Sequence, residues 1–397
     1  MTLIIFFLIL STLVLIHEFG HFYAGKKAGV KVHEFGLGLP PKVWSKKIDE
    51  TEYSINLLPI GGFVRMEGED PQEKVTDQKR SFQNKSILAR LSILLAGVFM
   101  NGVLGTLLFY FFFLFNNFIS GPIIYISDYK FLGAKVSTVE TVVSQLINKD
   151  LSDKLKPGDT IYNVSRSDGI SLNSFSRSDL ERGVDKQTKI STLASVKLKD
   201  FQNFVNESEG PISIYIYNIQ TQQTKEVEVI PKYDDKMNRK LIGIYLGSTI
   251  YLDYSNGAYQ KLLSGISHSY NVMGYSITTF AKLIYFSFVS RDVTVVSEGV
   301  SGPVGIFAVI KGVLESGSPN IFWVIVDLTA LLSLSLAIMN LLPIPALDGG
   351  RAMFVLLEFI TKRRLNPVVE GQVHRFGMIF LLLLLVLITF KDVLNLF

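Results

Sequence analysis

The chain has 397 residues, but 48% of them are hydrophobic and the mean hydropathy is +0.33, which is unlike an ordinary soluble protein. With 39 Lys and Arg against 35 Asp and Glu, the net charge of +4 gives no support to nucleic-acid binding. The lack of cysteine excludes disulfides, thiolate metal ligands and a cysteine nucleophile, so any metal must be held by histidine and carboxylate side chains.

Four apolar segments predict membrane-spanning helices. Residues 2–16 and 91–120 carry no charge, residues 321–342 carry only Asp327, and residues 377–390 are nearly all apolar. Such segments suit a membrane because about 20 apolar residues cross about 30 Å of hydrocarbon as a helix. No Lys or Arg precedes the first segment and no small-residue cleavage site follows it, so it is predicted to be a retained helix rather than a signal peptide.

The basic residues predict how these spans are oriented. Residues 23–85 hold eleven Lys or Arg, which places this loop in the cytoplasm, and residues 121–253 then lie outside. Both termini are expected outside, in agreement with the basic residues that follow the third span: Arg351, Lys362, Arg363, Arg364 and Arg375.

Two further stretches of the chain suggest non-spanning structure. Residues 254–290 mix aromatic and polar residues and are expected to form an amphipathic helix in the membrane interface, with a fifth span over 271–288 as the alternative. In the outer segment, alternation over 212–217 and 225–229 predicts two strands, and helical spacing predicts a helix over 196–205. Residues 155–161 read as a turn that enters a strand.

The strongest chemical signal is the pentad His17-Glu18-Phe19-Gly20-His21. In a helix, residues four apart share one face, so both imidazoles of this H-E-x-x-H pattern can reach one cation, with Glu18 as general base. The alternative is a pair of interfacial histidines with Glu18 as a capping charge. Because His17 lies about 24 Å along the helix, near the inner edge of the hydrocarbon, ionisable groups there are costly unless they pair or bind metal.

Catalytic zinc needs three protein ligands and an open position, so a third ligand is required. Three carboxylates compete: Asp327, Asp348 and Glu358. Asp327 lies about 9 Å below the outer surface, whereas Asp348 follows the inner end of the third span and has the depth of the histidines. Glu358 remains an alternative, although nothing around it resembles a shaped site.

The residues around Asp348 favour a site over a simple helix end capped by an aspartate. Pro343 and Pro345 break the helix, and irregular backbone at membrane depth survives only where it is buried or lines a cavity. Gly349 and Gly350 allow a close approach of chains.

These motifs carry a family resemblance. The pentad, together with N-L-L-P-I-P-A-L-D-G-G over 340–350, resembles the site-2 protease family and its bacterial regulator-of-sigma-E protease branch. Residues 59–68, residues 301–305 and a PDZ-like module between the second and third spans are further matches. The chain departs from the branch at Val98, where a proline is common, and in having one recognisable PDZ module where some members have two.

The resemblance implies a zinc metalloendopeptidase of the bacterial inner membrane, with its active site near the cytoplasmic face. Its substrates would be single-span membrane proteins, such as anti-sigma factors, or remnant signal peptides, often after an upstream site-1 protease has trimmed them. His17, His21 and Asp348 would hold Zn²⁺, Glu18 would activate water, and Asn340 would hold the substrate near the metal. A membrane zinc transporter or metal sensor, and an inactive peptide-binding scaffold, are the rival functions.

Residues 55–66 alternate apolar and polar side chains around Pro59 and Gly62, which predicts a re-entrant β-hairpin. Its free edge would pair with an extended substrate, and an ordinary cytoplasmic hairpin is the alternative. Pro343 and Pro345, whose helix break would admit water, are assigned to substrate binding together with four residues of the hairpin: Gly61, Gly62, Phe63 and Val64. The outer module would control access, by excluding bulky ectodomains rather than by binding a C-terminus, because it has no clear G-L-G-F loop.

The predicted fold is therefore a multi-pass α-helical membrane protein of about four transmembrane helices, with a re-entrant β-hairpin and an extracytoplasmic PDZ-like α+β domain. The expected segments are the first transmembrane helix (1–22), a cytoplasmic loop with the hairpin (23–85), the second transmembrane helix (86–120), the PDZ-like domain (121–253), the interfacial helix and a connection (254–320), the third transmembrane helix (321–350), and a cytoplasmic loop with the fourth transmembrane helix (351–397).

Overall fold

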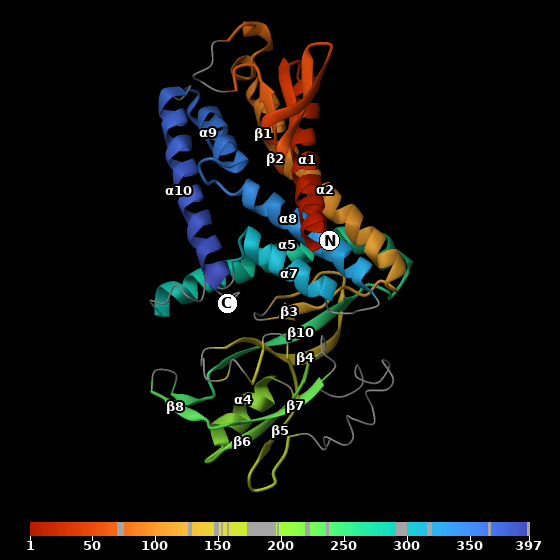
Figure 1. Cartoon of the computed structure of the whole chain (residues 1–397), viewed down its shortest axis with the longest axis vertical. Helices are drawn as coiled ribbons and strands as arrows, with labels where there is room; N and C mark the ends of the chain where they lie inside the picture. Colours follow the sequence, from red (N-terminus) through yellow and green to blue (C-terminus); the bar gives the residue numbers. More distant parts are fainter. Residues whose placement is uncertain are drawn as a thin grey trace. The chain divides into compact units, whose positions relative to one another are not determined.

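The computed structural model describes residues 1–69, 75–125, 129–146, 151, 154–156, 159–172, 196, 198–218, 223–235, 238–290, 300–315, 320–363 and 367–394. The chain forms two compact units. A helical unit comprises Met1–Phe112, Ser264–Glu315 and Pro319–Phe397, and a sheet unit comprises mainly Phe113–Leu263. Figure 1 shows the long helices of the first unit and the strands of the second.

Among the described residues, four helices are long and apolar enough to cross a membrane. They are α1 (Thr2–Lys27), α2 (Ile87–Phe115), α8 (Ile321–Leu341) and α10 (Pro367–Leu394), whose candidate span begins at Val368. Each of the four predicted apolar segments lies wholly or mostly in one of them. Two of the predicted bounds differ from the structure: α1 continues past residue 22 to Lys27, and α2 ends at Phe115 rather than at residue 120.

The stretch after the third span differs from the prediction, which ended the third transmembrane segment at residue 350, with a helix break at Pro343 and Pro345, and continued with a loop. In the structure α8 ends at Leu341, residues 342–347 are not helical, and α9 runs over Asp348–Thr361. Two prolines in this connection prevent α8 from continuing. Asp348 then opens α9, where a carboxylate is favoured by the helix dipole.

The described part of region 254–320 contains α5 (Ala258–Ser290) and α7 (Pro303–Glu315), and residues 291–299 and 316–319 lie outside it. α5 has two faces: His268 and Asn271 are buried, whereas Tyr270 and Phe288 are exposed. It is not among the four apolar helices, so the fifth-span alternative gains no support. Its position at a membrane interface stays a prediction.

A β-hairpin follows α1 and packs beside it. It consists of β1 (Val32–Ile48) and β2 (Thr51–Met66), which pair antiparallel. Residues 34–37 of β1 pair twice, with residues 62–65 and with residues 52–55, because both strands bend. The segment 62–66 thus forms one edge of the small sheet, and Met66 contributes to a core shared with α2 and α9. Two short 3-10 helices, η1 (Gln78–Arg80) and η2 (Phe82–Asn84), lead into α2.

The sheet unit contains one six-stranded sheet and a helix. The strands are β3 (Ile123–Tyr125), β4 (Lys135–Leu146), β5 (Thr160–Arg166), β6 (Ile212–Asn218), β7 (Gln223–Val229) and β10 (Ile244–Asp253), in the order β3-β10-β4-β5-β6-β7. The helix is α4 (Leu198–Glu207), and β8 (Lys232–Asp234) pairs with β9 (Arg239–Leu241).

The core of the sheet unit follows the predicted pattern. Phe201 and Val205 of α4 are buried with Ile212, Ile214 and Ile216 of β6. Both predicted strands and the predicted helix are present, with bounds shifted by about two residues, as is usual for helix ends. The predicted turn before β5 includes residues 157–158, which lie outside the described residues.

Candidate metal centre

Two imidazoles of α1 form the first half of the site. His17 and His21 are four residues apart and share a face of the helix, and each is 8% exposed. Their Nε2 atoms lie 3.1 Å apart, and their ring centroids 4.8 Å apart. Both imidazoles therefore present the same nitrogen to one buried point.

Asp348 completes the cluster from the first residue of α9. Its Oδ2 lies 3.0 Å from His17 Nε2 and 3.3 Å from His21 Nε2. Within the described residues, no other group of three His, Cys, Asp or Glu side chains lies close enough to share an ion.

The two alternative third ligands lie elsewhere. Glu358 forms an ion pair with Arg90 of α2, at 2.8 Å, and thereby joins α9 to α2. Asp327 belongs to the second turn of α8 and is not part of the cluster. Asp348, which the sequence places at the depth of the histidines, is thus also the carboxylate that lies beside them in the structure.

Hydrogen bonds at the second ring nitrogens orient the imidazoles. His21 Nδ1 lies 2.8 Å from the carbonyl oxygen of Ile93, so Nδ1 carries the proton and Nε2 is free to bind a metal. The side-chain amide of Asn101 lies 3.4 Å from His17 Nδ1, and its Oδ1 is buried with no hydrogen-bond partner among the described residues. Rotating this amide by 180° lets Oδ1 accept a hydrogen bond from His17 Nδ1–H, which gives both histidines the same tautomer.

Asn101 was not assigned a role by the sequence analysis. The available signal was its spacing from Gly97, because residues 93, 97 and 101 share the face of α2 that meets α1. The Asn101 carbonyl accepts a hydrogen bond of 2.8 Å from Ser333 Oγ, which fixes this turn of α2 against α8.

Glycines let the helices approach closely enough to build the site. A Cβ on Gly97 would lie 2.7 Å from His17 Cε1 and 2.8 Å from its Nε2, and would also meet His21 Nε2. A Cβ on Gly20, inside the pentad, would collide with the backbone of α2 at Ala96. Gly349 and Gly350 have the same function in α9, since side chains there would meet carbonyl oxygens of the α8–α9 connection.

The hairpin edge passes beside the proposed general base. A Cβ on Gly62 would lie 3.4 Å from Glu18 Cγ and 3.4 Å from Val14 Cγ1. Glu18 in turn interacts electrostatically with both histidines and Asp348. The structure therefore brings together Glu18, the metal cluster and the segment that was predicted to hold a substrate.

The other predicted substrate-binding residues are less closely gathered. In the hairpin, Gly61 has φ +87°, Phe63 packs its ring on Gly36, and Val64 is half-buried opposite Phe35. In the C-terminal half, Asn340 lies half-buried in the last turn of α8, and Pro343 is exposed. Pro345 packs against α10, where a Cβ on Gly377 would lie 2.5 Å from Pro345 Cβ, so this proline has a structural contact of its own.

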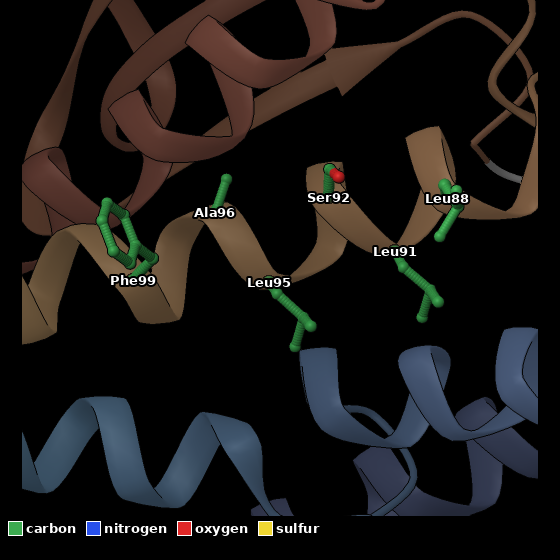
Figure 2. Close-up of a pocket in the computed structure, with 6 residues that line it drawn as sticks. All are labelled: Leu88, Leu91, Ser92, Leu95, Ala96 and Phe99. Atoms are coloured by element: carbon green, nitrogen blue, oxygen red, sulfur yellow. The ribbon is translucent and has the colours of Figure 1, made fainter.

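A cavity of 410 Å³ lies along α2, lined by Leu88, Leu91, Ser92, Leu95, Ala96 and Phe99. Figure 2 shows Leu91 and Leu95 pointing toward the C-terminal helices, drawn in blue, and Ala96 and Ser92 pointing to the opposite side. Ala96 precedes Gly97, which touches both imidazoles. The cavity is thus lined mainly by apolar side chains.

Comparison with known proteins identifies the family. The sequence profile of Peptidase family M50 matches residues 5–384. The chain belongs to peptidase family M50. A protein of Clostridium acetobutylicum named as a zinc metalloprotease is 32% identical over 98% of this chain and 97% of its own length. Proteins with the same description from Fusobacterium nucleatum (29% identical, 100% of both chains) and Staphylococcus aureus (27% identical, 99% and 98%) are also similar.

The M50 family is zinc dependent, so the protein is a zinc metalloprotease and not a metal transporter. The cluster fits that ion. Ligands about 2.0–2.1 Å from a tetrahedral zinc lie about 3.3 Å apart, and the three candidate atoms are 3.0, 3.1 and 3.3 Å apart. Two imidazoles and one carboxylate are also a donor set of catalytic zinc sites, and Asp348 Oδ2 is a buried atom with no hydrogen-bond partner in the part of the chain that the structure describes.

Proposed function

We propose that this M50 peptidase cleaves transmembrane helices of single-span proteins, or remnant signal peptides, inside the membrane. The observation that carries this proposal is the meeting of His17, His21 and Asp348 beside Glu18 within a unit built from apolar helices. A protease whose catalytic groups lie among membrane-spanning helices acts on peptide bonds that are themselves in the membrane.

Different residues bind the metal, transfer the proton and orient the imidazoles. His17, His21 and Asp348 hold the zinc ion, which when bound activates a water and polarises the scissile carbonyl. Glu18 takes the proton from the attacking water and passes it to the leaving amine. Ile93 and Asn101 keep the imidazoles oriented throughout, through the Nδ1 contacts.

The hairpin edge presents the substrate. A helical substrate hides its amides in internal hydrogen bonds, so it must be extended before cleavage, and an extended chain can add as a strand to the free edge of Gly61–Val64. Gly62 then brings that strand next to Glu18. The apolar cavity along α2 accepts an apolar side chain of the substrate near the cleaved bond.

Membrane insertion of the hairpin is supported by its exposed apolar residues. Leu39 is 44% exposed, Leu57 60% and Leu58 47%, and all three lie at the bend farthest from the β1–β2 turn. Contact with lipid removes such side chains from water. The hairpin is therefore re-entrant in this proposal.

The remaining features set orientation and access. The basic residues between α1 and α2 put that loop, and hence the metal centre, near the cytoplasmic face of a bacterial inner membrane. The sheet unit, a PDZ-like α+β domain, lies outside and excludes substrates with bulky ectodomains, which an upstream site-1 protease must first remove. Asn340 and Pro343 contribute to holding the unwound substrate.

The decisive experiment is co-expression of the protein with a panel of single-span proteins that lack ectodomains. Wild type is compared with Glu18→Gln, which keeps the size and the zinc ligands but removes the base. Loss of general-base catalysis is expected to slow cleavage by at least about 100-fold. Equal processing by both proteins would refute the catalytic assignment.

A second experiment tests the hairpin. Proline at Phe63 or Val64 removes one backbone N–H from the edge, so cleavage of a membrane substrate is expected to fall while bound zinc is unchanged. Both positions are needed because successive N–H groups point to opposite sides of a strand, and only one faces the free edge. Full activity in both proline variants would contradict substrate pairing at this edge.

A further inference from the structure

The connection that leads into Asp348 has a strained residue. Ala346, two positions before the carboxylate, has φ +80°, in the left-handed region that non-glycine residues rarely adopt. The turn over residues 344–347 contributes to holding this conformation, because the Leu347 N–H donates to the Ile344 carbonyl oxygen at 3.1 Å, and α10 adds two further contacts.

The first contact is a hydrogen bond to a histidine of α10. The backbone N–H of Ala346 donates to His374 Nδ1 at 2.9 Å, and the imidazole lies 5.4 Å from the ring of Phe354 of α9. Because Nδ1 accepts, it is unprotonated, and the neutral ring carries its proton on Nε2. That Nε2 atom is buried and has no partner among the described residues, so the single hydrogen bond of this ring is the one to Ala346.

The second contact is made one turn further along α10. A Cβ on Gly377 would lie 2.5 Å from Pro345 Cβ and 2.6 Å from the Pro345 carbonyl oxygen. The backbone of α10 therefore packs directly on Pro345. Two successive residues of the connection, Pro345 and Ala346, are fixed by a single turn of α10.

We infer that His374 is a positioning residue for Asp348. By holding the Ala346 amide, His374 fixes the direction in which the chain enters α9 and therefore the place of the carboxylate beside the two imidazoles. Without this hydrogen bond Ala346 relaxes to a negative φ, and Asp348 Oδ2 moves away from His17 and His21. The inference rests on the proposed function, because it takes Asp348 to be the third zinc ligand.

The experiment compares two replacements of His374 in the full-length protein, purified in detergent and assayed on a single-span substrate. His374→Leu removes the acceptor, and His374→Asn keeps one, because Asn Oδ1 occupies about the place of Nδ1. Leucine is expected to weaken zinc binding and kcat by about 10- to 100-fold with KM within about twofold, as is typical when a group supporting a ligand is lost. Asparagine is expected to stay within about threefold of wild type.

Zinc affinity is measured by competition with a chromogenic chelator, a readout that does not depend on catalysis. If the leucine protein does not accumulate, His374→Gln takes its place. The glutamine acceptor lies one atom farther along the side chain than Nδ1, so it does not occupy the position that the Ala346 N–H needs. Phe376→Leu is the matched control, since Phe376 is 74% exposed on the same turn. This variant is expected to change neither the zinc affinity nor kcat.

A second-site change separates positioning from simple packing of α10. Glycine adopts φ +80° without strain. Adding Ala346→Gly to the His374→Leu protein is therefore expected to raise its zinc affinity by at least about threefold. Wild-type zinc affinity in His374→Leu, an asparagine variant as weak as leucine, or no gain from Ala346→Gly would each overturn the inference. The proposed function fails separately, if Glu18→Gln still cleaves.

Discussion

Two helices of the same apolar character, α1 and α10, are used in opposite ways. In α1, 28% of the most apolar 18-residue stretch is buried, against 6% in α10. α1 meets α2 closely, with Gly20 against Ala96 and Gly97 against the imidazoles. α10 is mostly exposed from residue 378 to residue 387, and its described polar contacts lie near its two ends.

The difference shows that apolarity alone does not tell which membrane helix is part of a packed site. Where lipid and side chains are equally apolar, close packing depends on small residues, and these mark the contacts in both helices. Gly20 lies in the metal-binding turn of α1, whereas Gly377 marks the place where α10 touches Pro345.

The C-terminal end of α10 is held by a carboxylate. Asp392 Oδ2 accepts hydrogen bonds from the backbone N–H groups of Gly302, at 2.8 Å, and Gly305, at 2.9 Å. These residues surround the start of α7, where a helix dipole favours a negative charge. The S-G-P-V-G motif at 301–305 is thus a binding site for the end of α10.

The largest effect is expected from Gly97→Ala, which disrupts the close packing of α2 against α1. The added methyl group would overlap both imidazoles, so zinc binding and cleavage are expected to fall by at least about 100-fold, measured by metal content and by substrate processing. Gly102→Ala on the same helix is the control, because a Cβ there meets nothing within 4 Å. A zinc-loaded, active Gly97→Ala protein would contradict the description of α1 as closely packed.

The next effect concerns the orientation of His17. Asn101→Leu removes the contact to Nδ1 and is expected to weaken zinc affinity and kcat by about 10-fold or more. Asn101→Asp keeps an oxygen in place. This variant is expected to retain most of the zinc affinity and most of kcat, because His17 Nδ1–H donates to that oxygen. An aspartate variant as impaired as leucine would show that the Asn101 amide nitrogen, and not its oxygen, faces His17.

A smaller effect is expected at the C-terminal end of α10. Asp392→Ala leaves two backbone N–H groups of the α7 start without their acceptor, which costs about 1–3 kcal/mol of stability. Thermal unfolding in detergent should shift to lower temperature, while zinc affinity stays at the wild-type value. A drop in zinc affinity as large as that in Asn101→Leu would mean that α10 is tied to the metal centre along its whole length.

The smallest effect is expected in the connection between β2 and α2. Burial would raise the pKa of Glu67, but hydrogen bonds from Thr76, Asp77 and His33 lower it to about 2. A lowered pKa means that Glu67 stabilises the folded loop fully above its ordinary pKa of about 4.5, and that this contribution is lost as the pH falls from there toward about 2.

Hydrogen exchange of the Thr76 and Asp77 amides, corrected for intrinsic rates, measures this loss. Protection is expected to decrease through that acidic range in wild type and to be weak and independent of pH in Glu67→Gln. Unchanged protection in wild type down to pH 2 would show that the loop is held by other contacts.

The sequence predicted the elements whose signals are local. The pentad, the four apolar segments and the alternation in residues 212–217 each need only neighbouring residues to be recognised. Asp348 was also within reach, because proline breaks and depth along a helix are properties of the sequence. The start of α9 at Asp348 was missed, since a helix of 14 residues after two prolines resembles a charged loop when its partners are unknown.

The contacts that position the ligands could not be predicted. Asn101 and His374 lie 84 and 28 residues from the atoms they bind, and nothing local distinguishes them from other polar residues in apolar helices. The bends that give residues 34–37 two partners likewise depend on tertiary packing against α1.

The two-point attachment of α10 has a consequence for the surrounding lipid. The uncharged part of α10, residues 376–390, is about 22 Å long and therefore shorter than the hydrocarbon thickness of about 30 Å, so the bilayer must thin around it or the flanking charged side chains must snorkel. A thicker bilayer increases this mismatch, and the resulting force on α10 acts at its two attachments, which are α7 and the turn that holds Pro345 and Ala346. Acyl-chain length is thus a physical variable that acts on this enzyme at the residue next to its metal-binding turn.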